Sequence, residues 1–319
     1  MLSKSTLCHR LVLSIVCLIG LSLIMGCATK RDSALQQDSA ELLKARGAGD
    51  FAMTLDAAEA SFEKRVNRAD LEAAIARWEL ATTLETPDFS EDERRDAIAG
   101  IYEKLTRAYY FLADSHIAMT GDDESANHPE MMLVYEKGVT AAERALALRD
   151  PAFVAKINAG ESWQNNVANA DPAAIPALYW YATNLGKWAL LEGIATILAR
   201  KDDIKATMDF IIEKDPEFFH GAAYRYFGVY WTKLPFGKKP DESEAAFNRT
   251  LEISPNYFAS HVLLAENLAT LNNNRELFDK HLTYVLETPL DVVPELEPEN
   301  TFERKKAERL KKRGDRLFR

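Results

Sequence analysis

Apolar residues recur at intervals of three and four from about residue 55 to the end of the chain. A clear example is the run formed by Leu71, Ala74, Ile75, Trp78 and Ala81. This spacing places apolar side chains on one face of an α-helix, whereas a half-buried strand would alternate at every second residue. Ser90 followed by Glu93 is a capping box, which marks a helix start. The pattern therefore predicts an all-α body.

Four of the predicted helices end in the same way, with a proline and then, two residues later, an aromatic residue. The pairs are Pro87 and Phe89, Pro151 and Phe153, Pro216 and Phe218, and Pro255 and Tyr257. Proline cannot continue the helix before it but suits the first turn of the next helix. We expect each aromatic ring to pack into the angle between the two helices. Pro289 ends a fifth helix 34 residues after Pro255, which is the length of one tetratricopeptide (TPR) helix pair.

The best match to a TPR unit lies between residues 224 and 250. The first-helix positions are Tyr224, Phe227, Gly228 and Trp231, and the second-helix positions are Ser243, Phe247 and Thr250. The next unit fits poorly, because His281 takes the place of the phenylalanine. We predict a TPR-like helical-repeat superhelix with degenerate repeats and a C-terminal capping helix. An irregular helical bundle is the alternative.

The first 27 residues resemble a bacterial lipoprotein signal. Lys4 and Arg10 precede an uncharged run over 11–24, which has the length of a signal-peptide core and is short for a membrane span. Gly26 and Cys27 then complete a lipobox-like sequence. In such signals the cysteine becomes the new N-terminus and carries acyl chains. The alternatives are an uncleaved anchor and an ordinary secretory signal with a chance cysteine.

This interpretation divides the chain into a signal peptide over 1–26, a flexible tether over 27–50 and a helical-repeat domain over 51–319. Cleavage would remove two of the three cysteines, so Cys27 would be the one left and is the predicted lipidation site. Ala28 follows it, where an inner-membrane retention signal would place an aspartate. We therefore expect a periplasm-facing protein that is anchored by lipid to the outer membrane.

The charge of the chain argues against nucleic acid as a partner. The 319 residues include 39 Lys and Arg against 49 Asp and Glu, a formal net charge of -10, whereas phosphate binding needs a basic surface. Residues 301–319 are the exception, with nine Lys or Arg and three Asp or Glu. We expect a capping helix whose basic face lies in solvent or against acidic helices. A patch for membrane headgroups or for a partner is the sharper alternative.

No motif of a catalytic, metal or cofactor site is present in the sequence. There is no HExxH, no paired-cysteine motif, no P-loop and no GxGxxG, and no serine lies in a nucleophile elbow. The acidic residues are scattered over helical faces, as solvated charges are. We therefore predict a protein that is not an enzyme and that binds no metal and no cofactor.

A stretch dense in aromatic residues, over 176–188, resembles a known family when it is taken with Gly221, Arg225, Gly228 and the closing segment 294–300. The resemblance is to the TRAP-transporter-associated T-component (TatT-like) family, from about residue 55 to the end. It implies a non-enzymatic periplasmic lipoprotein, built on cryptic TPR units, that forms trimers. It also implies a partner, the solute-binding receptor of a tripartite ATP-independent periplasmic (TRAP) transporter, to which the protein would pass an apolar or organic-acid ligand.

Ligand pockets combine apolar walls with a few polar groups. The residues that suit this description are Tyr179, Trp180, Asn184, Trp188, Tyr224 and Arg225. Arg225 would meet a carboxylate with two parallel hydrogen bonds, because the substrates implied by the family are organic acids. The alternative is that the rings belong to the core and that Arg225 forms an ordinary ion pair.

Two other functions remain open from the sequence. One is a TPR scaffold lipoprotein of another envelope-assembly complex. The other is a carrier of lipids or hydrophobic solutes that acts without a TRAP transporter. Neither uses a motif that this sequence lacks, so binding experiments must separate them.

Overall fold

The computed structural model describes residues 31–121 and 124–318. Its large compact unit runs from Ser33 to Arg319, and every described residue of the hydrophobic core belongs to that unit. The predicted signal peptide over 1–26 and the predicted lipidation site Cys27 lie outside the described residues.

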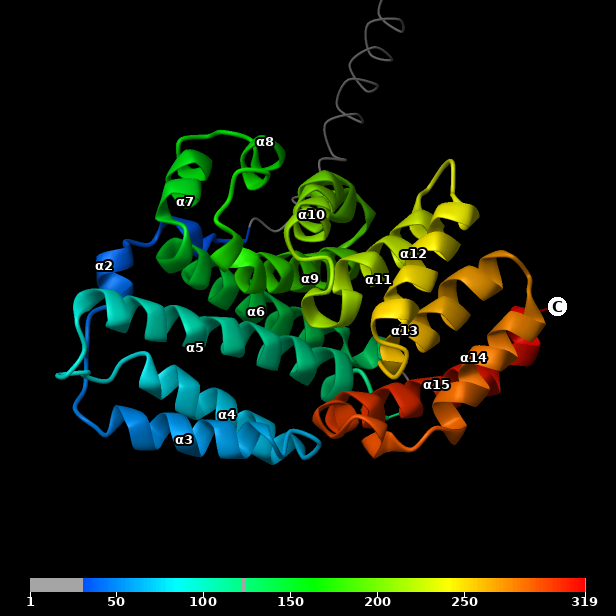
Figure 1. Ribbon diagram of the computed structural model, residues 1–319, viewed down its shortest axis with the longest axis horizontal. Coiled ribbons are helices and arrows are strands. Elements are labelled where there is room, and N and C mark those ends of the chain that lie inside the picture. Colours follow the sequence, from blue (N-terminus) through cyan, green and yellow to red (C-terminus); the bar gives the residue numbers. More distant parts are fainter. Residues whose placement is uncertain (1–30, 122–123, 319) are drawn as a thin grey trace, which may run out of the picture. The chain divides into compact units, whose positions relative to one another are not determined.

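Helices account for nearly all of the regular structure of this unit (Figure 1). They are α2 (Ser39–Leu42), α3 (Phe51–Phe62), α4 (Arg68–Ala81), α5 (Glu91–Phe111), α6 (His128–Arg149), α7 (Pro151–Asn158), α8 (Trp163–Val167), α9 (Ile175–Glu192), α10 (Ile194–Lys214), α11 (Phe218–Lys233), α12 (Pro240–Ile253), α13 (Phe258–Leu263), α14 (Arg275–Glu287) and α15 (Glu297–Leu317). Two π-helical segments, Leu112–Ile117 and Leu264–Ala269, continue α5 and α13. The described residues hold no strand, so the all-α prediction is confirmed.

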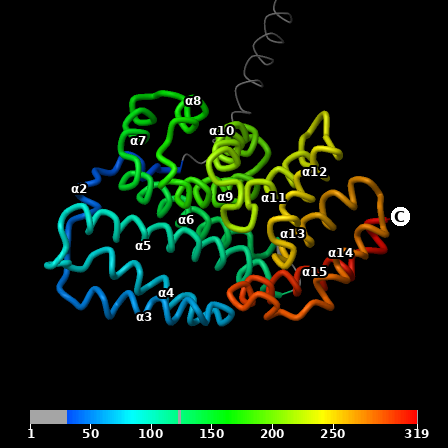
Figure 2. The backbone as a smooth tube through the Cα atoms, viewed as in Figure 1, coloured from blue at the N-terminus to red at the C-terminus, as the bar shows by residue number. Residues whose placement is uncertain are grey.

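Successive helices pack as pairs, and neighbouring pairs stack on one another (Figure 2). The pairs are α3 with α4, α5 with α6, α9 with α10, and α11 with α12. Helix α6 also packs against α9, which joins two pairs into one layer of core. The main hydrophobic core extends from Leu35 to Phe302, and two smaller core clusters lie among α11 to α15. This arrangement confirms the predicted helical repeat.

The pair α11 and α12 has the close approach that a TPR unit requires. A Cβ atom at Gly228 of α11 would lie only 2.8 Å from the ring of Phe247 of α12. The hydroxyl of Ser243 donates a hydrogen bond to the carbonyl of Gly228 at 2.6 Å, and the side chain of Phe247 is fully buried. The glycine and the serine therefore allow two helices to meet where larger residues would separate them.

The proline-containing ends lie where the sequence predicts them, but the aromatic residues differ in environment. Helices α6, α10 and α12 each end two residues before the proline and four before the aromatic position, and Phe153 and Tyr257 are buried as expected. Phe89 instead is 43 % exposed and rests its ring edge on Phe51, with centroids 5.6 Å apart. The connection between α4 and α5 is longer than the other three, and it leaves Phe89 outside the angle between the two helices.

Residues 33–50 pack against the helices, although the sequence predicted them as part of a flexible tether. The hydroxyl of Ser33 and the backbone N–H of Ala34 donate to the buried carboxylate of Glu143 of α6, at 2.9 and 2.7 Å. Leu35 and Leu42 enter the core. The compact unit therefore begins at Ser33 and not at residue 51, because a buried acid on α6 fixes the chain there.

Helix α15 caps the last repeat and also packs against the first half of the chain. It contacts α13 and α14, as a capping helix should. The ring of Phe302 in addition packs edge-on against Phe111 and His116, with centroids 5.4 and 4.5 Å apart. These contacts place α15 between the beginning and the end of the repeat array.

Polar contacts reinforce this position of α15. The ammonium of Lys306 pairs with Asp114 at 2.6 Å. The guanidinium of Arg309 donates to the carbonyls of Met119 and Gly121 at 2.8 and 2.6 Å. Part of the basic charge of α15 therefore has a structural use, because it satisfies acceptors at the end of the segment that continues α5.

Candidate functional site

Helix α11 begins with a left-handed turn of three residues. Phe219, His220 and Gly221 have φ angles of 43°, 63° and 66°. For the two residues with side chains, this conformation costs roughly 1–2 kcal/mol each and persists only where the surroundings hold it. Backbone strain of this kind clusters at functional sites. The residues around this turn are therefore candidates for a functional site.

Hydrogen bonds and ring contacts hold the turn in place. Arg225 donates to the carbonyl of His220 at 3.0 Å and to that of Phe219 at 3.4 Å. The hydroxyl of Thr250 in α12 donates to the same His220 carbonyl at 3.0 Å. The guanidinium of Arg225 lies 4.4 Å from the ring centroid of Tyr257, on which the His220 ring also stacks. Arg225 therefore clamps the strained backbone.

The turn directs the ring of Phe219 into a group of aromatic side chains. Its centroid lies 5.0 Å from that of Trp180, 5.9 Å from that of Tyr179 and 5.8 Å from that of Tyr257. Phe219 is half-buried, whereas the other three rings are buried. These four rings with Arg107 and Arg225 are called the central cluster below. It joins α5, α9, α11 and the segment before α13.

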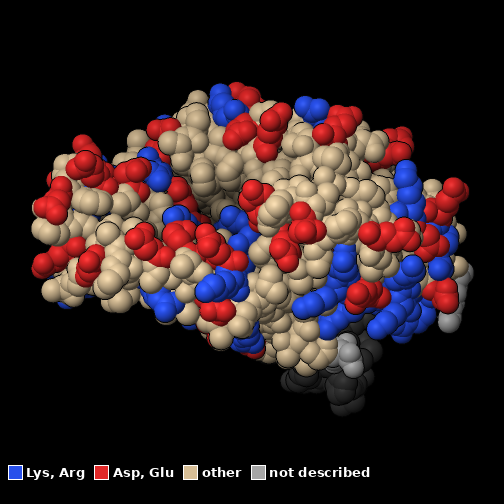
Figure 3. All heavy atoms as spheres, turned by 60° about the horizontal axis from the view of Figure 1, so that its bottom comes forward, with Lys and Arg blue, Asp and Glu red and all other residues tan. Residues whose placement is uncertain are grey.

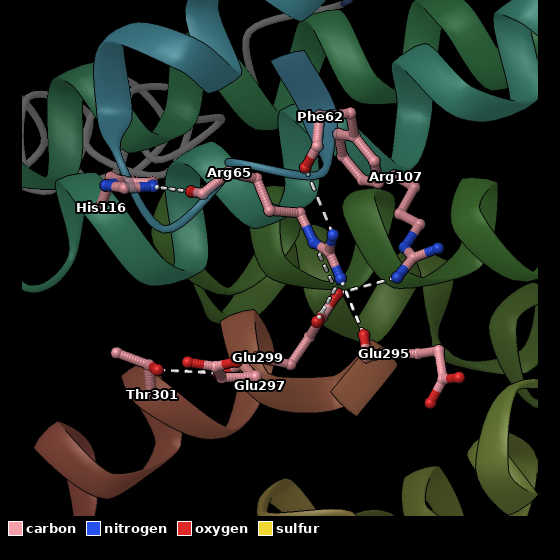
Figure 4. Close-up of polar contacts among 8 residues, drawn as sticks. All are labelled: Phe62, Arg65, Arg107, His116, Glu295, Glu297, Glu299 and Thr301. Atoms are coloured by element: carbon pink, nitrogen blue, oxygen red, sulfur yellow. Dashed lines mark hydrogen bonds and ion pairs between the residues drawn. The ribbon is translucent and has the colours of Figure 1, made fainter. Parts of the chain in front are cut away.

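Arg107 connects the central cluster to α15 (Figure 4). Its guanidinium lies 5.0 Å from the centroid of Phe219 and donates to Glu299 at 2.8 Å. Glu299 also accepts from Arg65 at 2.7 Å, and Arg65 in turn donates to the carbonyl of Glu295. The side chain of Glu299 is 8 % exposed and that of Arg107 is 30 % exposed. Arg107 is therefore the cation of this group that solvent reaches.

The electrostatics of the central cluster favour an anion. Burial disfavours the ionised form of Glu299, but Arg107 and Arg65 hold the pKa of this carboxyl below its ordinary value. Burial, with Arg225 and Arg107 nearby, lowers the pKa of His220, so its ring is neutral at pH 7. Arg225 bonds to backbone carbonyls, and no carboxylate in the described part of the chain forms an ion pair with it. Guanidinium groups beside aromatic walls suit an acid with an apolar body.

A family model described as TRAP transporter T-component matches residues 95–318. That span is well over half of the chain and includes the whole central cluster. The chain belongs to the TRAP transporter T-component family. No curated protein matches the chain. The family is one of transporter accessory components and is not a family of enzymes.

The description of the T-component family links this member to a transporter. Among the residues that the structure describes, no helix combines the length and the apolar character that crossing a bilayer requires. The described residues also hold no group of three His, Cys, Asp or Glu side chains with the geometry of a metal site.

Three of the six residues that the sequence proposed for ligand binding meet in the central cluster of this T-component. They are Tyr179, Trp180 and Arg225. Asn184 lies deeper, where its amide donates to the hydroxyl of Thr106 at 3.1 Å. Its side chain also fills the space above Gly138, because a Cβ atom there would lie 2.3 Å from the amide oxygen. Asn184 thus joins α9 to α5 and α6.

The other two proposed residues lie apart from the cluster. Trp188 is buried in α9, about two helical turns beyond Trp180. Tyr224 is half-buried and lies beside the guanidinium of Arg249. Tyr224 and Arg225 are consecutive in the sequence, but the side chains of consecutive residues in a helix point about 100° apart. The two side chains therefore face different neighbours.

Sequence reasoning missed Phe219 and Arg107 as members of the site. Phe219 reaches the site only through the left-handed turn. Phenylalanine and histidine do not indicate such a turn in a sequence. Arg107 is one of several arginines on α5, and nothing in its local sequence separates it from Arg95. Tyr257 had a signal, because it belongs to the repeated proline-aromatic helix ends.

A separate groove lies beside the N-terminal segment of the unit and holds none of the six proposed residues. Its volume is about 880 Å³, and its walls come from the segment around Leu42 and from α4, α5 and α6. Acids and bases share its rim, including Glu41, Glu79, Lys137 and Arg144. This mixture of charges selects no ligand class.

Proposed function

We propose that this T-component is a periplasmic, lipid-anchored accessory protein that binds the solute-binding receptor of a TRAP transporter and passes it an organic acid with an apolar body. Family membership supports the link to a TRAP transporter. The single observation that carries the ligand class is Arg107, a solvent-reached guanidinium against the ring of Phe219. Stacked helix pairs add an extended surface for the receptor.

In this proposal the residues of the central cluster have different roles in ligand binding. The rings of Tyr179, Trp180 and Phe219 hold the apolar body of the ligand, and Arg107 meets its carboxylate. Arg225 acts through the backbone, because its hydrogen bonds keep Phe219 in place. The proposal also includes acylation of Cys27 and assembly into a homotrimer, as the family resemblance implies.

Receptor binding tests the central claim. The processed protein would be mixed with the solute-binding receptor of the same transport system, and complex formation would be followed by pull-down and by calorimetry. We expect a complex at protein concentrations of about 50 µM or below. No complex at that concentration would contradict the association and favour an envelope scaffold of another system.

Ligand binding tests the central cluster separately. Octanoate is a suitable probe, because it joins one carboxylate to an apolar chain. We expect Arg107→Gln to weaken octanoate binding at least about tenfold, since a charge-assisted hydrogen bond is lost. Arg95→Gln is the matched control, because Arg95 lies on the same helix but pairs only with Glu91 and Asp92 at the surface. Equal affinities of the two variants would exclude Arg107 as the carboxylate site.

Native mass spectrometry of protein purified without detergent would complete the test. Co-purified organic acids support the carrier role, and the mass of the complex reports whether three copies assemble. The mass of the mature N-terminus reports acylation, which Cys27→Ser should abolish.

A further inference from the structure

Helix α15 carries two sets of cations that the fold uses differently. Arg304, Lys306 and Arg309 point to protein acceptors: Arg304 donates to the carbonyl of Val285 at 3.1 Å, and the other two were described above. A second set, Lys311, Lys312, Arg313 and Arg316, is exposed. Among the described residues none of these four forms an ion pair. They are called the basic face below.

Packing does not account for the basic face. The side of α15 that enters the core is formed by Phe302, Ala307 and Leu310. The nearest acid along the helix, Asp315, pairs with Arg275 of α14 at 3.1 Å. Among the described residues, the four cations therefore contribute no ion pair that holds α15 in place.

Solubility does not account for the basic face either. The formal net charge of the chain is -10, so positive residues bring the molecule closer to neutrality and reduce the repulsion between copies. Lys and Arg gather on the side of the molecule formed by α14 and α15, while acids dominate much of the rest of this view (Figure 3). A local positive field on an acidic protein indicates recognition of an anionic partner.

The basic face lacks the features of a protein interface. Protein partners gain most of their binding energy from apolar or aromatic anchors at the centre of the contact. No large hydrophobic side chain of α15 is exposed among the described residues. A layer of lipid headgroups needs no such anchor, because its charges are mobile and attract a row of cations without a shape match.

We propose that the basic face of α15 binds the anionic headgroups of a phospholipid membrane. The four cations lie within six consecutive positions, 311–316, near the end of the unit marked C in Figure 1. Each cation near an anionic surface is worth about fivefold in partition, and salt weakens the attraction. This contact does not depend on the TRAP receptor or on a ligand.

Vesicle sedimentation tests the proposal. Residues 33–319 form the compact unit and hold every described core residue, so they can be used without the predicted leader once circular dichroism shows that they are folded. The probes are phosphatidylcholine vesicles with and without about one third phosphatidylglycerol. We expect binding to the anionic vesicles alone, and loss of that binding when the salt concentration is raised to about 0.5 M.

A pair of double variants separates the basic face from general charge. Lys311→Glu with Lys312→Glu should lower partition at least about twentyfold, because two cations are replaced by two acids. Lys233→Glu with Lys238→Glu changes the net charge equally at exposed positions elsewhere and should lower it less than about threefold. Helical content measured for each variant distinguishes lost binding from lost folding.

Three outcomes would overturn the proposal. The first is equal binding to neutral and anionic vesicles, and the second is an equal loss in the two double variants. The third is no vesicle binding together with salt-sensitive binding of the receptor that Lys311→Glu with Lys312→Glu removes, which would assign the face to an acidic protein.

Discussion

Two successive helix pairs occupy the same places in the repeat but meet through different chemistry. In α11 and α12 the contact is apolar, with the ring of Phe247 over Gly228. In the next unit, 34 residues later, His281 replaces the phenylalanine and Val262 replaces the glycine. There the ring nitrogens Nδ1 of His261 and His281 lie 2.8 Å apart. The repeat thus fixes where helices meet and leaves open what holds them together.

The histidine pair has one proton arrangement that satisfies its contacts. Nε2 of His261 lies 2.8 Å from the carbonyl of Pro255 and must carry the hydrogen. Nδ1 of neutral His261 is then an acceptor, so Nδ1–H of His281 donates to it. Burial, followed by His261 and Lys280, lowers the pKa of His281 to about 4. The second unit therefore depends on pH through a buried histidine pair, whereas in the first a single histidine, His220, contacts Ser254 at the end of α12 at 3.1 Å.

The two pairs also begin differently. Helix α11 starts with the strained turn that Arg225 and Thr250 hold from within the repeat. The start of α13 is held by α15. Asn300 of α15 accepts a hydrogen bond from the backbone N–H of Phe258 and donates one to the carbonyl of Asn256, both at 3.1 Å. The regular unit supplies its own support, and the degenerate unit takes its support from the capping helix.

The largest expected effect is in the apolar unit. Gly228→Val should destabilise the unit by about 4 kcal/mol, since its side chain would meet the buried ring of Phe247 and separate the helices. Urea denaturation measures the change. Gly186→Ala is the control, because its Cβ would lie an ordinary 3.5 Å from Ile204 and should change stability by less than about 1 kcal/mol. Similar losses in both would refute the close-approach argument.

An intermediate effect is expected where α15 supports α13. Asn300→Ala should cost about 3 kcal/mol, because it leaves a buried donor and a buried acceptor without a partner. Thr301→Ala, at the next position, removes only a hydrogen bond within α15 and should cost less than about 0.5 kcal/mol. Hydrogen exchange would show faster opening of α13 in the first variant. Unchanged protection of α13 would mean that its start is stable without α15.

The smallest effect is the pH dependence of the histidine pair. The unfolded chain takes up a proton near pH 6.5, whereas folded His281 does so near pH 4. The unfolded state binds more protons between these values, so stability falls as the pH drops through that window. We expect a loss of about 1–2 kcal/mol between pH 7 and pH 5.

His281→Phe should flatten this part of the pH profile, because it restores the residue that the repeat pattern places there. The measurement is the thermal midpoint at several pH values. His128→Gln, at the start of α6, serves as the comparison variant. A profile for His281→Phe that keeps the full slope would assign the pH dependence to other groups.

Local patterns predicted the parts of the molecule that depend on neighbours in the sequence. The spacing of apolar residues predicted the helices, and Pro151, Pro216 and Pro255 predicted where three of them end. The match over 224–250 placed Gly228 and Phe247 at TPR positions of two successive helices. These features follow from periodicity and from the φ restriction of proline, which act within one or two helical turns.

The parts that were missed depend on contacts between distant residues. Phe219 reaches the central cluster through a left-handed turn that Arg225 and Thr250 impose, and no propensity of phenylalanine indicates such a turn. Asn300 supports the start of α13, 42 residues earlier in the sequence, and no local pattern indicates that contact. Ser33 looked like part of a tether, and only the buried carboxylate of Glu143, more than a hundred residues away, makes it part of the unit.

The hydrogen bond between Ser33 and Glu143 fixes the point at which a tether would join the compact unit. If the chain is anchored at Cys27, a tether that ended at residue 50 would span at most about 80 Å, whereas one that ends at Ser33 spans at most about 20 Å. With such an anchor, the shorter tether would keep the compact unit within about its own diameter of the membrane. A partner would then bind the protein at the membrane surface.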